Sequence, residues 1–161
     1  PGSKTSFFIA IGDNWSRKTI YNSMCSIIPN INFATIIHPS ANIGKNVKLG
    51  KGVFIAAGAT VNVDTKIGKF SILNTNSSID HDSKLGSFSS LGPNSSTGGH
   101  VIIKNLSAVC IGATVLQGVT IGKETVIGAG SLVTVNCGNN GVFYGTPAKR
   151  IKSRRKNDIY I

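Results

Sequence analysis

The chain has 161 residues, enough for one domain with a small appendage, and 40% of them are hydrophobic. A formal net charge of +11 indicates either an anionic partner or a heavily solvated surface. The lysines are dispersed and are not interleaved with aromatic residues, so we expect no nucleic-acid partner. No apolar run approaches the roughly 18 residues of a membrane-spanning helix, so we also expect no membrane insertion.

The three cysteines, Cys25, Cys110 and Cys137, are odd in number and lack metal-binding spacing. We interpret them as reduced thiols, and therefore expect a cytoplasmic protein.

Residues 1–36 are predicted to form a partial α/β segment. Residues 7–11 are a short apolar run typical of a buried strand, residues 16–26 have a helical pattern, and residues 32–37 resemble a second strand. On this helix we place Arg17 on the solvent-facing side. The segment is therefore expected to be a β-α-β unit that leans on the domain after it.

Residues 37–135 contain a six-residue repeat. From Ile37 to Val133, every sixth residue is Ile, Leu or Val at 16 of 17 positions, and the exception is Thr97. This period fits neither a helix nor an ordinary strand, and it predicts a mainly β fold, a parallel β-helix in which each hexad is one short strand and a bend. Three hexads make one triangular coil, so residues 18 apart should stack at roughly 4.8 Å.

Residues 136–161 are predicted to be a C-terminal extension. A polar turn at 136–140 precedes an apolar segment at 141–145, and a basic tail occupies 152–156. The sequence carries no recognisable phosphate-binding loop and no zinc-protease motif.

One histidine in the repeats has neighbours suited to catalysis. His81 lies between Asp80 and Asp82, and a carboxylate beside an imidazole orients it and makes it more basic. Gly99 stands one coil above, at the break in the aliphatic register, where bare backbone admits a ligand and offers N–H groups to an oxyanion. The competing interpretation is an ordinary exposed histidine. His100, beside this break, is the other histidine that a ligand could reach.

The histidines do not predict a metal site. His38, His81 and His100 are separated by 43 and 19 residues, which matches no common metal-binding pattern, so we expect no bound metal. By its position alone, next to Pro39 at the start of the repeats, His38 is interpreted as structural.

Taken together, these features resemble the bacterial hexapeptide-repeat acyltransferases, in the branch of sialic acid O-acetyltransferases and nucleotide-amino-sugar N-acetyltransferases. The resemblance rests on the hexads and on residues 80–82, 97–99 and 145–149, and residues 8–14 and 36–41 are similar to the junction that precedes the prism in this branch. It covers nearly the whole chain.

The resemblance implies a left-handed prism, a homotrimer, and acetyl-CoA bound as co-substrate between neighbouring prisms. It implies that His81 is the general base and that Asp82 orients it. The CoA contacts it implies are Gly99, Ile111, Ala129, Lys149 and Arg150. The candidate contacts to a small-molecule sugar substrate are Asn14, His38 and Ser90. We also expect segments 55–57 and 133–135 to face outward and to be covered in the trimer.

The chain departs from the branch at two places. The Gly-rich β-α-β segment with which this branch begins is absent from the sequence, which we interpret as a truncation or a variant. Ser90 stands where some members carry a second histidine.

The expected function is an acetyl-CoA-dependent acetyltransferase that acts on an amino sugar, nucleotide-linked, in bacterial surface-glycan biosynthesis. A hydroxyl acceptor, as in sialic acid O-acetylation, remains an alternative. A metal-dependent hydratase like the γ-type carbonic anhydrases would need three converging histidines, which the spacing does not supply. A non-catalytic β-solenoid scaffold would bind no CoA.

Overall fold

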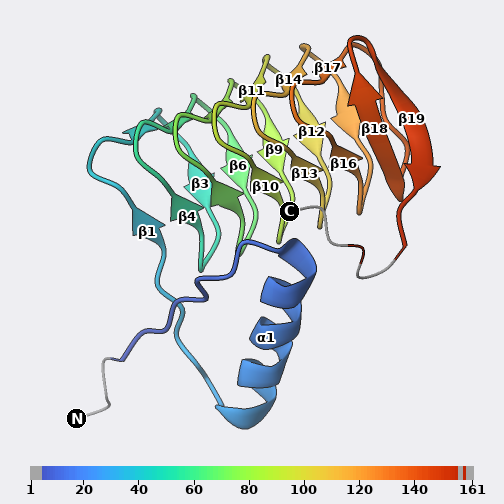
Figure 1. The fold of residues 1–161 in the computed structure, drawn as a ribbon. Helices are drawn as coiled ribbons and strands as arrows, with labels where there is room; N and C mark the ends of the chain where they lie inside the picture. Colours follow the sequence, from blue (N-terminus) through green and yellow to red (C-terminus); the bar gives the residue numbers. More distant parts are fainter. Residues whose placement is uncertain (1–4, 156–157, 159–161) are drawn as a thin grey trace.

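In a computed structural model of the chain, residues 5–155 and residue 158 are described. The chain forms a triangular stack of short strands, with one helix and an N-terminal segment beside it (Figure 1). The helix, α1, spans Asn14–Ile27. No helix in this part of the chain has the length and apolar character that crossing a bilayer requires.

Three parallel sheets form the faces of the stack, and each takes every third strand. The first sheet contains β1 (Ile36–Ile37), β4 (Phe54–Ile55), β7 (Ile72–Leu73), β10 (Ser90–Leu91), β13 (Ala108–Val109) and β16 (Val126–Ile127). The second contains β2 (Asn42–Ile43), β5 (Thr60–Val61), β8 (Ser78–Ile79), β11 (Ser96–Thr97), β14 (Thr114–Val115) and β17 (Leu132–Val133). The third contains β3 (Lys48–Leu49), β6 (Lys66–Ile67), β9 (Lys84–Leu85), β12 (Ile102–Ile103) and β15 (Thr120–Ile121).

The register of the stack follows the six-residue repeat. Neighbouring strands align residues 18 positions apart, as in the pairs Ile55–Leu73 and Leu73–Leu91. The second residue of every strand from β1 to β17 is one of the predicted axial positions. From Ile55 onward the aliphatic axial side chains form one continuous core, in which Ile79 and Leu91 are fully buried. Ile37 and Ile43, on the first coil, are 42% and 39% exposed. The predicted mainly β, parallel-helix fold is therefore confirmed.

The prediction that segments 55–57 and 133–135 face outward is wrong for most of their residues. Ile55 and Val133 are axial residues with 0% and 1% exposure, and Ala56 is 6% exposed. Thr134 and Val135 are exposed, Val135 at 65%. Ile55 and Val133 are themselves axial positions of the repeat, so the repeat buries them within the protomer.

The N-terminal segment is less regular than a β-α-β unit. Phe7 and Phe33 form a single parallel bridge in place of two strands, and the first strand of the stack begins at Ile36. The segment packs on the corner between the third and first sheets. There, outward-pointing Phe70, Phe88 and Leu106 form a second hydrophobic cluster with its residues.

Arg17 anchors this segment, and the prediction that it faces solvent is wrong. The side chain is 1% exposed. Its Nε donates to the Phe70 carbonyl at 2.8 Å, and its Nη1 donates to the carbonyls of Ile11 and Gly12 at 2.8 and 2.7 Å. Backbone carbonyls thus solvate the buried guanidinium and tie α1 to the corner.

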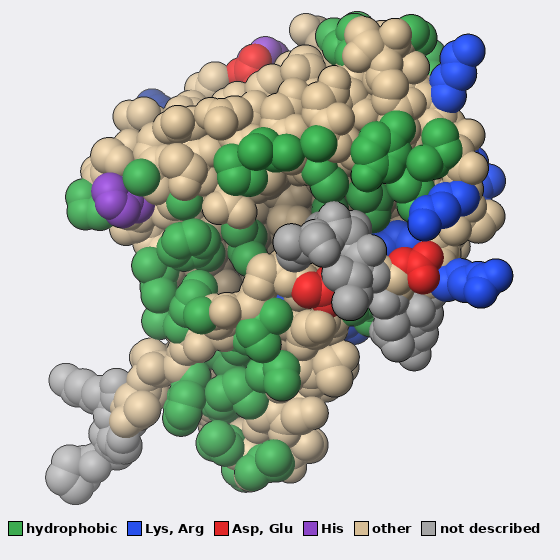
Figure 2. All heavy atoms as spheres, viewed as in Figure 1, with side chains coloured by type: hydrophobic (Ala, Val, Ile, Leu, Met, Phe, Trp, Pro, Cys, Tyr) green, Lys and Arg blue, Asp and Glu red, His purple; other side chains and the backbone are tan. Residues whose placement is uncertain are grey.

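A hairpin covers the C-terminal end of the stack. Strand β18 (Gly141–Gly145) pairs in parallel with β16 in the first sheet, and β19 (Ala148–Ser153) runs antiparallel to β18. Figure 2 shows Lys and Arg side chains on the side of the molecule where this hairpin lies. Lys156 of the predicted basic tail is outside the described residues.

Candidate active site

His81 occupies the corner between the second and third sheets, where β8 ends and β9 begins. Its Nδ1 lies 2.9 Å from Asp82 Oδ2, and the imidazole is 39% exposed. This hydrogen bond is the main reason that the pKa of His81 is raised above 6.5. The predicted His81–Asp82 pair is thus present, and its other ring nitrogen is left to meet a substrate.

Asp80 and Thr97 hold this corner in shape. Asp80 Oδ1 accepts hydrogen bonds from the His81 backbone N–H at 2.8 Å and from Asn62 Nδ2 at 2.6 Å. The bond from His81 is the largest cause of the lowered pKa of Asp80, which therefore stays ionised. The backbone N–H of Asp80 donates to Thr97 Oγ1 at 3.2 Å. Thr97, the one non-aliphatic axial residue, therefore holds the Asp80 backbone in place, a role that the repeat alone did not show.

Gly99 lies directly against the His81 ring. A Cβ at Gly99 would come within 2.5 Å of His81 Nε2 and 2.6 Å of Cε1. No side chain fits there without moving the imidazole. The predicted stacking of Gly99 on His81 is therefore present, and it leaves backbone beside the reactive nitrogen.

His100 approaches the same carboxylate. Its Nε2 lies 3.9 Å from Asp82 Oδ2, and its ring is 5.1 Å from the His81 ring at 87°. The ligand atoms of His81, Asp82 and His100 lie within 4.8 Å of one another, a grouping that could accept a metal ion. The spacing between the histidines did not indicate this convergence, although His100 stands 18 residues, one coil, after Asp82. The absence of a bound metal remains a prediction.

Three other predicted residues line a groove of about 310 Å³ between Gly12 and the first sheet. They are Ser90, Ile111 and Ala129, and Cys110 and Tyr144 complete that part of the wall. Burial raises the pKa of the Cys110 thiol, which therefore stays neutral. Ile111 and Ala129 follow β13 and β16, so the groove opens at the corner between the first and second sheets.

The remaining predicted residues line neither the His81 corner nor the groove. Lys149 and Arg150 are exposed on β19, and Lys149 pairs across the hairpin with Tyr144 of the groove wall. His38 is exposed on the first coil, with Nδ1 2.9 Å from Ser40 Oγ. Asn14 is fully buried, and its Nδ2 donates to the Ser107 carbonyl at 3.1 Å. This hydrogen bond lies inside the protein, where a substrate does not reach Asn14. The structure therefore corrects the interpretation of Asn14 as a substrate contact.

Within one protomer, the His81 corner and the predicted CoA groove are therefore two separate places. The His81 corner and the groove lie at opposite edges of the second sheet.

Comparison with known proteins identifies the family. No protein-family model matches the chain. The solved structure of PerB from Caulobacter crescentus, in complex with CoA and GDP-perosamine, has a TM-score of 0.88 to this chain. The two are 36% identical over 92% of this chain and 70% of PerB. The chain belongs to the bacterial hexapeptide-repeat acyltransferases. Its stack is the left-handed β-helix of these acyltransferases, as predicted.

Two further relatives agree with this family. The acetyltransferase domain of PglB from Neisseria gonorrhoeae FA1090, solved with acetyl coenzyme A, is 26% identical over 91% of this chain and 70% of that domain, with a TM-score of 0.86. The galactoside O-acetyltransferase of Lactococcus lactis subsp. lactis (strain IL1403) is 53% identical over 47 residues. That match spans 29% of this chain and only 22% of the relative.

Proposed function

We propose that this acyltransferase transfers the acetyl group of acetyl-CoA to the amine of a nucleotide-linked amino sugar. The observation that carries the proposal is the His81 imidazole, hydrogen-bonded to Asp82 and lying against bare Gly99 backbone. The similarity to GDP-perosamine N-acetyl transferase, solved with CoA and its nucleotide sugar, supports an amine acceptor over a hydroxyl.

In the proposed reaction, the sugar nitrogen attacks the thioester carbonyl of acetyl-CoA. His81 Nε2 accepts the proton that the amine loses, and Asp82 stabilises the imidazolium that forms. Backbone N–H groups near Gly99 stabilise the oxyanion, and its collapse breaks the carbon–sulfur bond. The CoA thiolate leaves and takes up the proton, which restores neutral His81.

The proposed site is shared between protomers. His81 of one chain would face the groove of a neighbour, in which Ile111 and Ala129 contact CoA and Ser90 lies near the acceptor. In a homotrimer the second sheet would then face the symmetry axis. Its outward residues support this, because all six are uncharged: Asn42, Thr60, Ser78, Ser96, Thr114 and Leu132.

Lys149 and Arg150 are proposed contacts to the phosphates of CoA. Both are exposed cations on the hairpin that borders the groove. We place the reaction in the cytoplasm, in the biosynthesis of surface glycans. The free cysteines Cys25, Cys110 and Cys137 fit a reducing compartment.

Thiol release from acetyl-CoA, measured across a panel of nucleotide-linked amino sugars and sialic acid, tests the proposal. With the best acceptor, His81→Ala should lower turnover by about 10² to 10⁴, the range for a lost general base, while CoA still binds. Wild-type turnover in His81→Ala would show that the base is elsewhere, and O-acetylation of sialic acid alone would exclude the amine acceptor.

A further inference from the structure

One face of the stack, the third sheet, differs in charge from the other two. The first residue of each two-residue strand points outward, because the second points to the axis. On the first and second sheets, the outward residues of β1 to β17 are all uncharged. On the third sheet, three successive outward residues are lysines, namely Lys48, Lys66 and Lys84.

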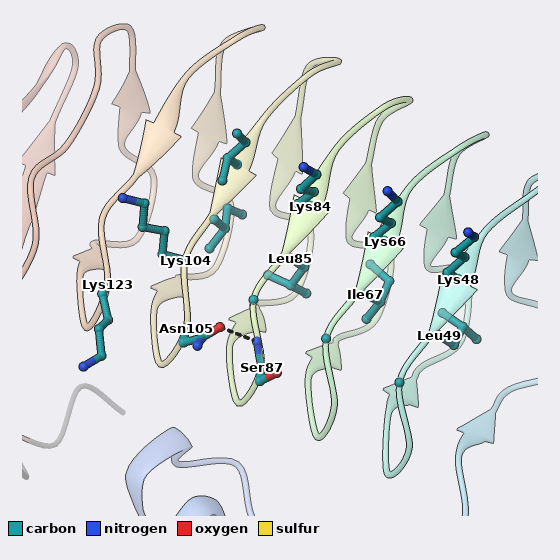
Figure 3. Close-up of a pocket in the computed structure, with 15 residues that line it drawn as sticks. Lys48, Leu49, Lys66, Ile67, Lys84, Leu85, Ser87, Lys104, Asn105 and Lys123 are labelled. Atoms are coloured by element: carbon teal, nitrogen blue, oxygen red, sulfur yellow. Dashed lines mark hydrogen bonds between the residues drawn. The ribbon is translucent and has the colours of Figure 1, made fainter.

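These lysines border a shallow groove of about 560 Å³ along the third sheet (Figure 3). Lys104 and Lys123 continue the row from the turns after β12 and β15, so that each of five successive coils contributes one lysine. Figure 3 shows the three strand lysines pointing away from the axial residues Leu49, Ile67 and Leu85. The groove lining contains no carboxylate. We call this surface, lined by Lys48, Lys66, Lys84, Lys104 and Lys123, the lysine face.

Most of this charge is unpaired within the described residues. Lys123 lies 3.0 Å from Glu124, whereas the other four lysines of the face form no ion pair there. Two carboxylates, Asp64 and Asp82, border the lysine face, because they line one pocket with Lys48 and Lys66, but neither forms an ion pair with these lysines within the described residues. Asp64 accepts from Asn46 at 3.0 Å, and Asp82 is bonded to His81. Like charges directly opposite on neighbouring strands are destabilising, so an external anion would relieve the repulsion along the row.

We propose that the lysine face docks on an anionic phospholipid surface. Lys45 and Lys51 flank Lys48 at the two corners of its coil, and the Lys51 ammonium lies over the Tyr21 and Phe33 rings, so the cations extend beyond a single line. Cations spread in this way fit a plane of phosphate headgroups better than a linear polymer. The outward strand residues of this face include no aromatic side chain that would stack nucleobases. Ile102, 38% exposed among the lysines, adds an aliphatic contact at the same level.

This docking is compatible with the proposed trimer. If the second sheet faces the symmetry axis, each third sheet lies on the outside, and one lysine face at a time can rest on a flat membrane. The proposal concerns location, and it stands whether or not the acceptor is an amino sugar.

Vesicle flotation tests the docking. One set of vesicles contains phosphatidylcholine alone, and the other contains equal parts of phosphatidylcholine and phosphatidylglycerol. Wild-type protein should float only with the second set and should dissociate as salt is added. Each lysine near an anionic bilayer contributes about a fivefold factor to binding, so the combined Lys48→Gln, Lys66→Gln and Lys84→Gln variant should bind roughly a hundredfold more weakly.

A charge-matched variant separates the lysine face from net charge. Lys18→Gln, Lys152→Gln and Arg155→Gln remove three cations elsewhere and should leave binding within a few-fold of wild type. Melting temperature confirms that both variants are folded. The proposal is overturned if the two variants weaken binding equally, if wild type binds neutral vesicles as well, or if it binds double-stranded DNA but no vesicles at the same salt.

Discussion

Asp82 sets the proton affinity of His81, because their hydrogen bond is the largest cause of the raised pKa of the imidazole. The proposed base must be neutral to accept a proton, so kcat/KM should rise with pH through a pKa above 6.5. Asp82→Asn removes the carboxylate that favours the imidazolium. The acidic limb of the profile should therefore move to lower pH, with a smaller loss of maximal turnover than in His81→Ala. An unmoved limb would place the titrating group elsewhere.

Gly99→Ala tests the close contact with the imidazole. Its backbone does not require glycine, but the new Cβ would lie 2.5 Å from His81 Nε2 and must displace the ring. A reacting group moved by about 1 Å loses roughly 10²-fold in turnover, so we expect a loss of that order with little change in melting temperature. Gly138→Ala is the matched control, because its Cβ would meet nothing within 4 Å. Equal turnover in both variants would contradict the proposed geometry.

At the scale of single residues, the sequence predicted part of the site. The 18-residue coil placed Gly99 on His81, since that stacking follows from the repeat. The approach of His100 to Asp82 follows from the same coil, because these residues are also 18 apart, and the prediction missed it by comparing only the spacings between histidines. The hydrogen bond of Thr97 did not follow, since periodicity reports only that an axial residue is not aliphatic.

At the scale of elements, the strands were predictable and the docking of α1 was not. Each strand needs only local information, an aliphatic residue at every sixth position, and the stack then repeats one contact along its length. The burial of Arg17 depends on the Phe70 carbonyl, 53 residues away in sequence. No local pattern distinguishes such an arginine from an exposed one.

Arg17→Met should loosen α1 from the stack. The change leaves the carbonyls of Phe70, Ile11 and Gly12 without their guanidinium donor, which should lower the free energy of unfolding of this segment by about 3 kcal/mol. Trp15, the only tryptophan, lies on α1 and reports its release by fluorescence in a guanidinium titration. Lys18→Met is the control. If both variants release Trp15 at the wild-type midpoint, the anchor is not Arg17.

At the scale of the whole molecule, the second and third sheets differ in charge and in the apolar residues beside them. The second sheet is uncharged, and exposed aliphatic residues mark the corners beside it: Ile111 at 53%, Leu116 at 45% and Val135 at 65%. The third sheet carries lysines, which would repel their symmetry mates at an axis. Burial of these aliphatic residues and repulsion between the lysines of neighbouring protomers therefore both favour assembly through the second sheet and exposure of the third sheet.

Two matched substitutions test this orientation. Thr114 and Thr120 are half-buried outward residues of β14 and β15, on the second and third sheets. Light scattering should find three wild-type chains per particle. Thr114→Arg buries a charge at the proposed interface and should give inactive monomers, while Thr120→Arg should remain trimeric and active. A wild-type monomer with full turnover would exclude the shared site.

Mixing of two inactive variants distinguishes a shared site from a site within one chain. His81→Ala removes the base, and Ile111→Arg blocks the groove at the other edge of the second sheet. If base and groove come from neighbouring protomers, random co-assembly at equal amounts restores roughly a quarter of the sites, because an Ile111→Arg chain supplies His81 to the intact groove of a His81→Ala chain. If both halves act within one chain, no combination of the two variants can rebuild a site, and the mixture stays inactive.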